Sequence, residues 1–169
     1  MELKEILFND FDGIYAEMEK NFIASERRDY SEQKNLLNNP LFKTYHIIIK
    51  DKKVGFITVW LLKNCAFIEH FVIFEEERGK GLGEQTLNMI KQIYNNVVLE
   101  CEPETLSALA NRRLNFYKRN GFYNNGIEYF QPPYRKNGLA VRLELMSYPT
   151  PLLEVEKVVE EIYQKVYNR

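Results

Sequence analysis

The stretch best suited to chemistry is EEERGKGLGEQTLNMI, residues 75–90. Gly79, Gly81 and Gly83 fall within five residues, and a regular apolar stripe follows them. Ordering a glycine in a helix costs about 1 kcal/mol relative to alanine, so three glycines at a helix start need a reason. Glycine lets the backbone approach a ligand closely, and free amides at a helix N-terminus bind anions. The stretch therefore indicates a phosphate-binding loop, to which Arg78 can add a charge-assisted contact.

The spacing of these glycines excludes two common nucleotide motifs. A P-loop needs GxxxxGK[ST], which is absent, and a dinucleotide fingerprint needs GxGxxG, whereas Glu84 stands where the third glycine would be. On the glycines alone, the alternative is a flexible turn that binds nothing.

The elements before the loop predict an antiparallel β region. TYHIIIK, KVGFITVWLL and AFIEHFVIF (44–50, 53–62 and 66–74) follow one another too closely for crossover helices, and Asp51-Lys52 gives a hairpin signal. MELKEILF (1–8) is typical of a short first strand. Asn9-Asp10 can cap a helix that ends near Asn21, and a short helix is expected near residues 31–37.

The elements after the loop alternate between helix and strand. Leu82, Met89, Ile90 and Ile93 lie on one helical face, and NVVLECE (96–102) is a strand that we expect to pair in parallel after a right-handed crossover. A second helix is predicted over 104–120, with Leu106, Leu109, Ala110, Leu114 and Tyr117 on one side and Gly121 as its stop. Strands at 122–130 and 139–148 and a terminal helix, about 151–168, complete the chain. The apolar stripe of that helix favours docking on its own core over a dimer seam.

The chain resembles the GNAT superfamily of N-acetyltransferases. RGKGLG matches the R/Q-x-x-G-x-G/A signature through Arg78, Gly81 and Gly83, and FYKRNGF is similar to Y-x-x-x-G-F through Tyr117 and Gly121-Phe122. The resemblance runs from about residue 3 to 148. It implies an α/β (α+β) fold with a mixed, mostly antiparallel central sheet flanked by helices, here with an extra C-terminal helix. We expect one N-acetyltransferase domain over 1–169.

The resemblance implies acetyl-CoA as the acetyl donor. Backbone groups of Phe71, Val72 and Ile73 would bind the pantetheine arm like an added strand. The pyrophosphate would be held by amides of Arg78, Gly79, Lys80, Gly81, Leu82, Gly83 and Glu84. The family often has an asparagine seven residues before the tyrosine, where this chain has Ala110. Asn111, one residue further, is carried over as a weaker cofactor-binding candidate.

Acetyl transfer to an amine needs a base and an acid, because an alkylamine is protonated at neutral pH and the leaving thiolate benefits from a proton. Tyr117 is the acid candidate by its place in the matched motif; its alternative is a core tyrosine. Glu69 is the base candidate, and period-two alternation predicts that it faces the same side as Phe71 and Ile73, with His70 opposite in a packed or hydrogen-bonded role. The alternative for Glu69 is an exposed or salt-bridged glutamate.

Glu100 and Glu102 alternate with Cys101 at the end of the next strand. They are expected to attract a cationic amine or to act as the base instead; the alternative is a pair of solvated strand-end charges. His46, Cys65 and Cys101 form no recognisable metal or nucleophile constellation, so we expect no metal. Cys65 and Cys101 could form one disulfide, but in a cytosolic chain we expect reduced thiols.

The composition limits the remaining function classes. The chain has 169 residues and a net charge of −1 without a basic segment, so we expect no nucleic-acid partner. It has no long apolar run and no signal-peptide pattern, so we expect no membrane partner and a cytoplasmic location. The sequence predicts an N-acetyltransferase that acts by direct attack of a primary amine, most simply a small cationic one, as a monomer or homodimer. The alternatives are a non-enzymatic CoA-binding sensor or interaction module and a protein N-terminus or lysine acetyltransferase.

Overall fold

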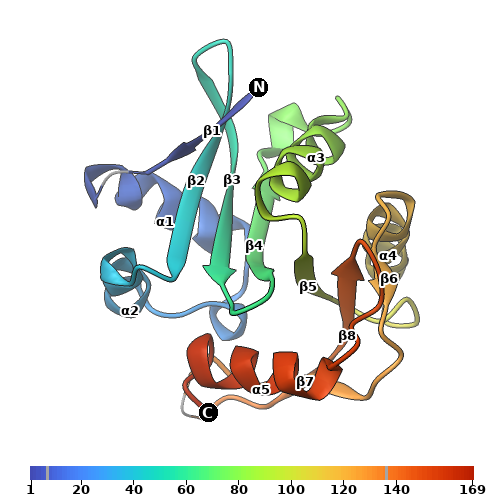
Figure 1. The fold of residues 1–169 in the computed structure, drawn as a ribbon. Helices are drawn as coiled ribbons and strands as arrows, with labels where there is room; N and C mark the ends of the chain where they lie inside the picture. Colours follow the sequence, from blue (N-terminus) through green and yellow to red (C-terminus); the bar gives the residue numbers. More distant parts are fainter. Residues whose placement is uncertain (7, 136) are drawn as a thin grey trace.

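The computed structural model describes residues 1–6, 8–135 and 137–169. Its eight-stranded sheet has the order β1-β2-β3-β4-β5-β8-β6, and β7 pairs with β8 (Figure 1). The strands are β1 (Glu2–Glu5), β2 (Phe42–Ile49), β3 (Lys52–Leu61), β4 (Ala66–Ile73), β5 (Val97–Cys101), β6 (Tyr123–Asn124), β7 (Tyr129–Gln131) and β8 (Val141–Tyr148). The helices are α1 (Phe11–Asn21), α2 (Tyr30–Asn35), α3 (Leu82–Tyr94), α4 (Ala108–Arg119) and α5 (Val155–Lys165). The predicted mixed, mostly antiparallel sheet flanked by helices is confirmed.

The antiparallel half of the sheet follows the predicted order. β2, β3 and β4 pair with their neighbours in sequence, and β1 pairs with β2. The turn between β2 and β3 is centred on Lys50 and Asp51, which both have positive φ angles, 46° and 63°. Leu7, within the stretch predicted as the first strand, lies outside the described residues.

The strand–helix–strand unit β4–α3–β5 is parallel, as predicted. The ladder between β4 and β5 contains three Cα pairs and ends at Ile68 and Leu99, while β5 pairs along its whole length with β8. β4 therefore continues for five residues beyond its last partner on β5.

Two predicted elements differ in extent. α4 begins at Ala108 because the Ser107 side chain accepts a hydrogen bond from the Ala110 amide (3.0 Å) and caps the helix. Leu106 therefore precedes the helix. Leu106 and Leu109 are both exposed, although both were predicted to lie on the apolar side of this helix. The strand predicted over 122–130 is divided into β6 and β7 at Asn125-Gly126.

The two faces of the sheet are covered by different helices. α3 and α4 pack with Ile57, Ile68 and Leu99 on one face. On the opposite face, α1 packs against Phe56 and Val72, and α5 packs against Trp60. In Figure 1, α5 (red) runs along the lower end of the sheet, away from the β2–β3 turn. Its apolar stripe docks on the core, as predicted.

Cys65 and Cys101 are free thiols. Within the described ranges, no group of three or more His, Cys, Asp and Glu side chains is placed to hold a metal ion. None of the helices in the described part of the chain has the length and apolarity that crossing a membrane would require.

Candidate functional site

The candidate site lies where β4 and β5 separate. No residue of β5 pairs with the segment 69–73 of β4 among the described residues. Glu69 is partly exposed although its side chain is 0% exposed, so its exposed atoms belong to the backbone. A strand edge with unpaired amides and carbonyls can accept an extended ligand in the manner of an added strand. Phe71 and Ile73, the next residues in alternation, are also partly exposed.

A β-bulge at Glu69 changes the faces predicted for this strand. Thr58 pairs with His70 but Val59 pairs with Ile68, so Glu69 is an extra residue. A bulge interrupts the alternation of side chains, and Glu69 lies on the face of α1 and α5, opposite Phe71. The predicted orientation of Glu69 was therefore wrong. His70 lies on the same face as Glu69, with its Nδ1 atom 3.6 Å from Glu69 Oε2, although its predicted buried and hydrogen-bonded role is confirmed.

The glycine loop leads from β4 into α3 with the conformation that glycine permits. Gly79 and Gly81 have φ angles of 78° and 72°, and Gly81 is the N-cap of α3. Gly83 lies where space is short: a Cβ atom there would lie 3.1 Å from Cζ of Phe116 on α4. The loop thus presents a helix N-terminus without side chains at two turn positions, which fits an anionic group such as a pyrophosphate.

The charged side chains of the loop are engaged by the protein itself. Arg78 donates from Nε to the Ile73 carbonyl (2.9 Å) and from Nη2 to Asn21 Oδ1 (2.8 Å), which ties the end of β4 to the end of α1. Lys80 pairs with Glu77 (2.7 Å). The backbone amides from Gly79 to Glu84 are therefore the better candidates for holding a pyrophosphate, whereas the predicted Arg78 amide donates to the Glu75 carbonyl (3.2 Å). Arg78 acts here as a structural tie.

Tyr117 lies on the α3/α4 face, beside the end of β5. Its ring packs against Phe116 and Phe122 (centroid distances 5.3 and 5.8 Å). Burial, and then the neighbouring Cys101, raise the pKa of the Tyr117 hydroxyl, so it stays protonated at neutral pH. Asn111, the weaker cofactor candidate, is exposed on α4, and its Oδ1 atom accepts a hydrogen bond from Asn115 (2.6 Å).

Glu69 is held in a buried ion pair on the opposite face. Arg28, between α1 and α2, donates from Nη1 to Glu69 Oε1 (2.7 Å) and also bonds the carbonyl of Val166 after α5. The guanidinium lies over the rings of Trp60 and Tyr134, 5.8 and 4.9 Å from their centroids. Burial alone would raise the pKa of Glu69, but Arg28 and then His70 lower it to about 2.

Glu100 lies on the same face as Glu69 and is bonded only by neutral groups. Tyr129 donates to its Oε1 atom, Gln131 donates to Oε2 (3.0 Å), and the Tyr167 hydroxyl lies 2.8 and 3.0 Å from the two oxygens. Burial raises the pKa of Glu100 more than these hydrogen bonds lower it, and the pKa is therefore raised to about 7. Glu102, by contrast, is neutralised by Arg113 (2.6 Å) near the surface.

The residues that surround these carboxylates were not predicted from the sequence. Arg28, Tyr129, Tyr134 and Tyr167 come from segments far apart in the chain and belong to no motif. The apolar stripe of the terminal helix was the one available signal, since its docking brings Tyr167 to the end of the sheet.

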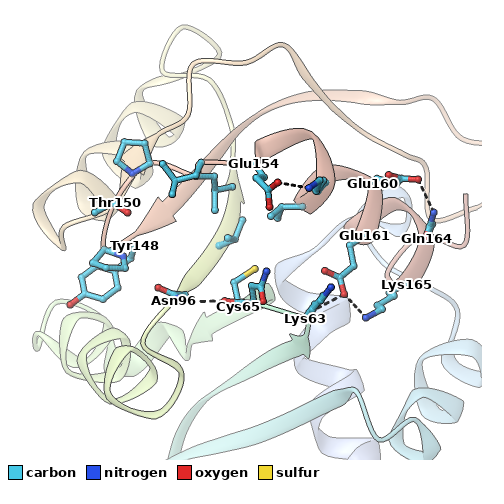
Figure 2. Close-up of a pocket in the computed structure, with 18 residues that line it drawn as sticks. Lys63, Cys65, Asn96, Tyr148, Thr150, Glu154, Glu160, Glu161, Gln164 and Lys165 are labelled. Carbon is cyan, nitrogen blue, oxygen red and sulfur yellow. Dashed lines mark hydrogen bonds and ion pairs between the residues drawn. The ribbon is translucent and has the colours of Figure 1, made fainter.

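A separate cavity of about 650 Å³ lies at the other end of β4 (Figure 2). It is bounded by the β3–β4 turn at Lys63–Cys65, by residues 148–154 and by α5. Its rim is lined by charges that pair with one another, as Glu154 does with Lys157 and Glu161 with Lys165 (Figure 2). Because the glycine loop follows the opposite end of β4, this cavity is not the proposed cofactor site.

Comparison with known proteins agrees with this geometry. Residues 42–124 match the family model of the acetyltransferase (GNAT) domain. The chain carries a GNAT acetyltransferase domain. The match to this GNAT domain includes β2 to β5, the glycine loop and α4.

Solved structures extend the similarity over the whole chain. A protein from Bacteroides thetaiotaomicron that is assigned to the GNAT family has a TM-score of 0.91 at 26% identity, covering 100% of this chain and 99% of its own. A spermidine N-acetyltransferase chimera from Vibrio cholerae has a TM-score of 0.64 at 17% identity, covering 86% and 93%. An aminoglycoside 6'-N-acetyltransferase solved with coenzyme A has 0.62 at 15%, covering 90% and 99%. No curated protein sequence matches the chain.

Proposed function

We propose that this GNAT protein transfers the acetyl group of acetyl-CoA to the primary amine of a small, cationic molecule by direct attack. The observation that supports this best is the separation of β4 from β5 beyond Ile68 and Leu99, which we call the opening between these strands. It has an acid candidate, Tyr117, on one face and two buried carboxylates, Glu69 and Glu100, on the other. A thioester in the opening would have a proton donor on one side and a proton acceptor on the other.

The cofactor would enter from the face of α3 and α4. Its pantetheine arm would lie along Phe71, Val72 and Ile73, and its pyrophosphate at the N-terminus of α3. When bound, acetyl-CoA supplies the thioester that the amine attacks. The chain's own groups orient the cofactor through backbone amides and carbonyls, and Tyr117 offers a proton at the sulfur.

The amine would approach from the face of α1 and α5. Of the three acidic candidates, Glu69 and Glu102 are paired with arginines, so Glu100 is the one without a cationic partner among the described residues. We infer that Glu100 contributes most to attracting a positively charged amine. The free thiols of Cys65 and Cys101 support a reducing compartment such as the cytoplasm.

The test is turnover with a defined amine panel. Spermidine, tyramine, an aminoglycoside and a lysine-containing peptide are each incubated with acetyl-CoA, and thiol release and the acetylated product are measured. We expect acetylation of at least one small amine, with the peptide a poor acceptor. Binding of acetyl-CoA without turnover of any amine would instead favour a CoA-binding sensor, and a preference for the peptide would favour a protein acetyltransferase.

A further inference from the structure

Two buried carboxylates mark the point where β4 and β5 separate. The last pair of the ladder is Ile68 and Leu99, and Glu69 and Glu100 are the next residue on each strand. The bulge at Glu69 turns its side chain to the face on which Glu100 lies. The charge of Glu69 is one of the causes that raise the pKa of Glu100. The proposed function leaves open which of the two receives the proton of the amine.

The partners of the two carboxylates differ in charge. Glu69 has a guanidinium at 2.7 Å, together with the Trp60 indole N–H (3.1 Å) and the Tyr134 hydroxyl (3.3 Å). Glu100 has only hydroxyl and amide donors, from Tyr129, Gln131 and Tyr167. A carboxylate next to a buried arginine stays ionised, because protonation would leave the guanidinium without its counter-charge.

Other charged and titratable groups face Glu100 from several elements. Glu69 faces it from β4, with Arg28 behind, Tyr129 from β7, Tyr134 from the loop before β8, and Tyr163 and Tyr167 from the end of α5. Burial first, and then Glu100, raise the pKa of Tyr167 far above its usual value, so its hydroxyl remains a donor. Glu100 is therefore the acid of this group that is suited to exchange a proton near neutral pH.

We propose that Glu100 accepts the proton that the amine loses, and that Tyr167, two residues before the end of the described chain, is the positioning residue that holds both carboxylate oxygens. The Arg28–Glu69 pair stays ionised and orients Tyr134 beside them. This inference rests on the proposed acetyl transfer and assigns its base.

The ammonium gives one proton to Glu100, and the free nitrogen lone pair forms the C–N bond at the thioester carbonyl. The C–S bond then breaks, the sulfur takes the proton of Tyr117, and the second nitrogen proton restores Tyr117. Glu100 releases its proton to solvent before the next cycle, so one amide, one CoA thiol and one proton are produced.

The experiment measures kcat/KM against pH for the best amine of the panel named above, in wild type, Glu100→Gln, Tyr167→Phe and Glu69→Gln. We expect an acidic limb near pH 7 in wild type and its loss in Glu100→Gln, with a fall of about 10²-fold or more above that pH. Tyr167→Phe should move the limb to higher pH, because it removes a hydrogen bond that favours the ionised carboxylate. Glu69→Gln should keep the limb but move it to lower pH, because it removes a negative charge that raises the pKa of Glu100. A purely structural role for Tyr167 would leave the position of the limb unchanged.

A second measurement needs no amine and no turnover. Infrared difference spectra of the protein alone should show one buried carboxylic acid that ionises near pH 7 and disappears in Glu100→Gln. His70→Gln is the control for the histidine of this cluster and should retain the signal. If Glu100→Gln keeps both the acidic limb and the infrared signal, the proposal is overturned. If wild type acetylates no amine, acetyl transfer itself fails, while the infrared signal still decides whether Glu100 exchanges a proton in this range.

Discussion

The guanidinium of Arg28 and the carboxylate of Glu69 form an ion pair that joins the segment before α2 to the point where β4 leaves β5. Both side chains are almost fully excluded from water, with 8% and 0% exposed. Arg28 also donates to the Val166 carbonyl, so the pair fixes the chain after α5 to the centre of the sheet. We therefore expect the loss of this ion pair to lower the stability of the fold more directly than it lowers catalysis.

Arg28→Met should destabilise the protein by about 3–5 kcal/mol, because it leaves Glu69 charged and buried without its partner. Chemical denaturation at pH 7 measures the loss. The double variant Arg28→Met/Glu69→Leu removes both charges and should recover much of it. Lys43→Met, which breaks an exposed pair with Glu5, is the control and should cost no more than about 1 kcal/mol. Equal costs for Arg28→Met and Lys43→Met would contradict a special role for the buried pair.

Tyr117→Phe should lower kcat by about 10²-fold or more and leave stability nearly unchanged. Phenylalanine keeps the ring contacts with Phe116 and Phe122, and the hydroxyl has no hydrogen-bond partner among the described residues that would be lost. Steady-state kinetics and thermal unfolding of the same samples separate the two effects. Retained kcat with a lowered Tm would support the alternative of a core tyrosine.

Glu84→Pro should weaken acetyl-CoA binding by about 10-fold or more, whereas Glu84→Ala should not weaken it. Glu84 is exposed in the first turn of α3, where the amide has no intrahelical acceptor and proline is tolerated. The two variants differ in whether residue 84 keeps its N–H group, and a hydrogen bond to a charged group is worth about 1.5–3 kcal/mol. Calorimetric titration with acetyl-CoA measures the difference. Gly83→Val is a poorer probe, because its side chain would collide with Phe116.

Much of the fold could be predicted because its signals are local. The β2–β3–β4 meander follows from consecutive β-rich runs, and the parallel β4–β5 pair from the helix between them. The faces of Glu69 and His70 could not be predicted, because alternation assumes an unbroken ladder and the bulge opposite Thr58 depends on tertiary packing. Leu106 matched a helical stripe, but the Ser107 cap starts the helix after it.

The candidate site was predictable only where a motif carries it. The glycine loop and Tyr117 stand in matched motifs, and the positive φ angles of Gly79 and Gly81 agree with a turn before a helix. Arg28 and Tyr167 are 139 positions apart and meet only because α5 docks under the sheet. No spacing within one element could have placed them beside Glu69 and Glu100.

His46 should make the protein less stable as the pH falls below about 6.5. His46 is 4% exposed in β2, and neither nitrogen of its ring has a hydrogen-bond partner among the described residues. Burial, and then the charge of Lys53, lower the pKa of His46 below its ordinary value of about 6.5. The unfolded chain therefore binds a proton at a higher pH than the folded protein does. The stability present above pH 6.5 is lost as the pH falls toward the folded pKa, by at most about 1.4 kcal/mol per pH unit.

His46→Leu removes this titration and puts an apolar side chain in place of the buried imidazole. The difference in unfolding free energy between His46→Leu and wild type should therefore grow in favour of the variant from pH 7.5 to pH 5.5, measured by urea denaturation at closely spaced pH values. His70→Gln is the matched control, because His70 is the other of the chain's two histidines and its ring is hydrogen-bonded to the Glu26 carbonyl (3.1 Å). It should preserve the contribution of His46 to the slope. Parallel pH profiles for wild type and His46→Leu would show that His46 takes up its proton equally well in the folded and unfolded chain.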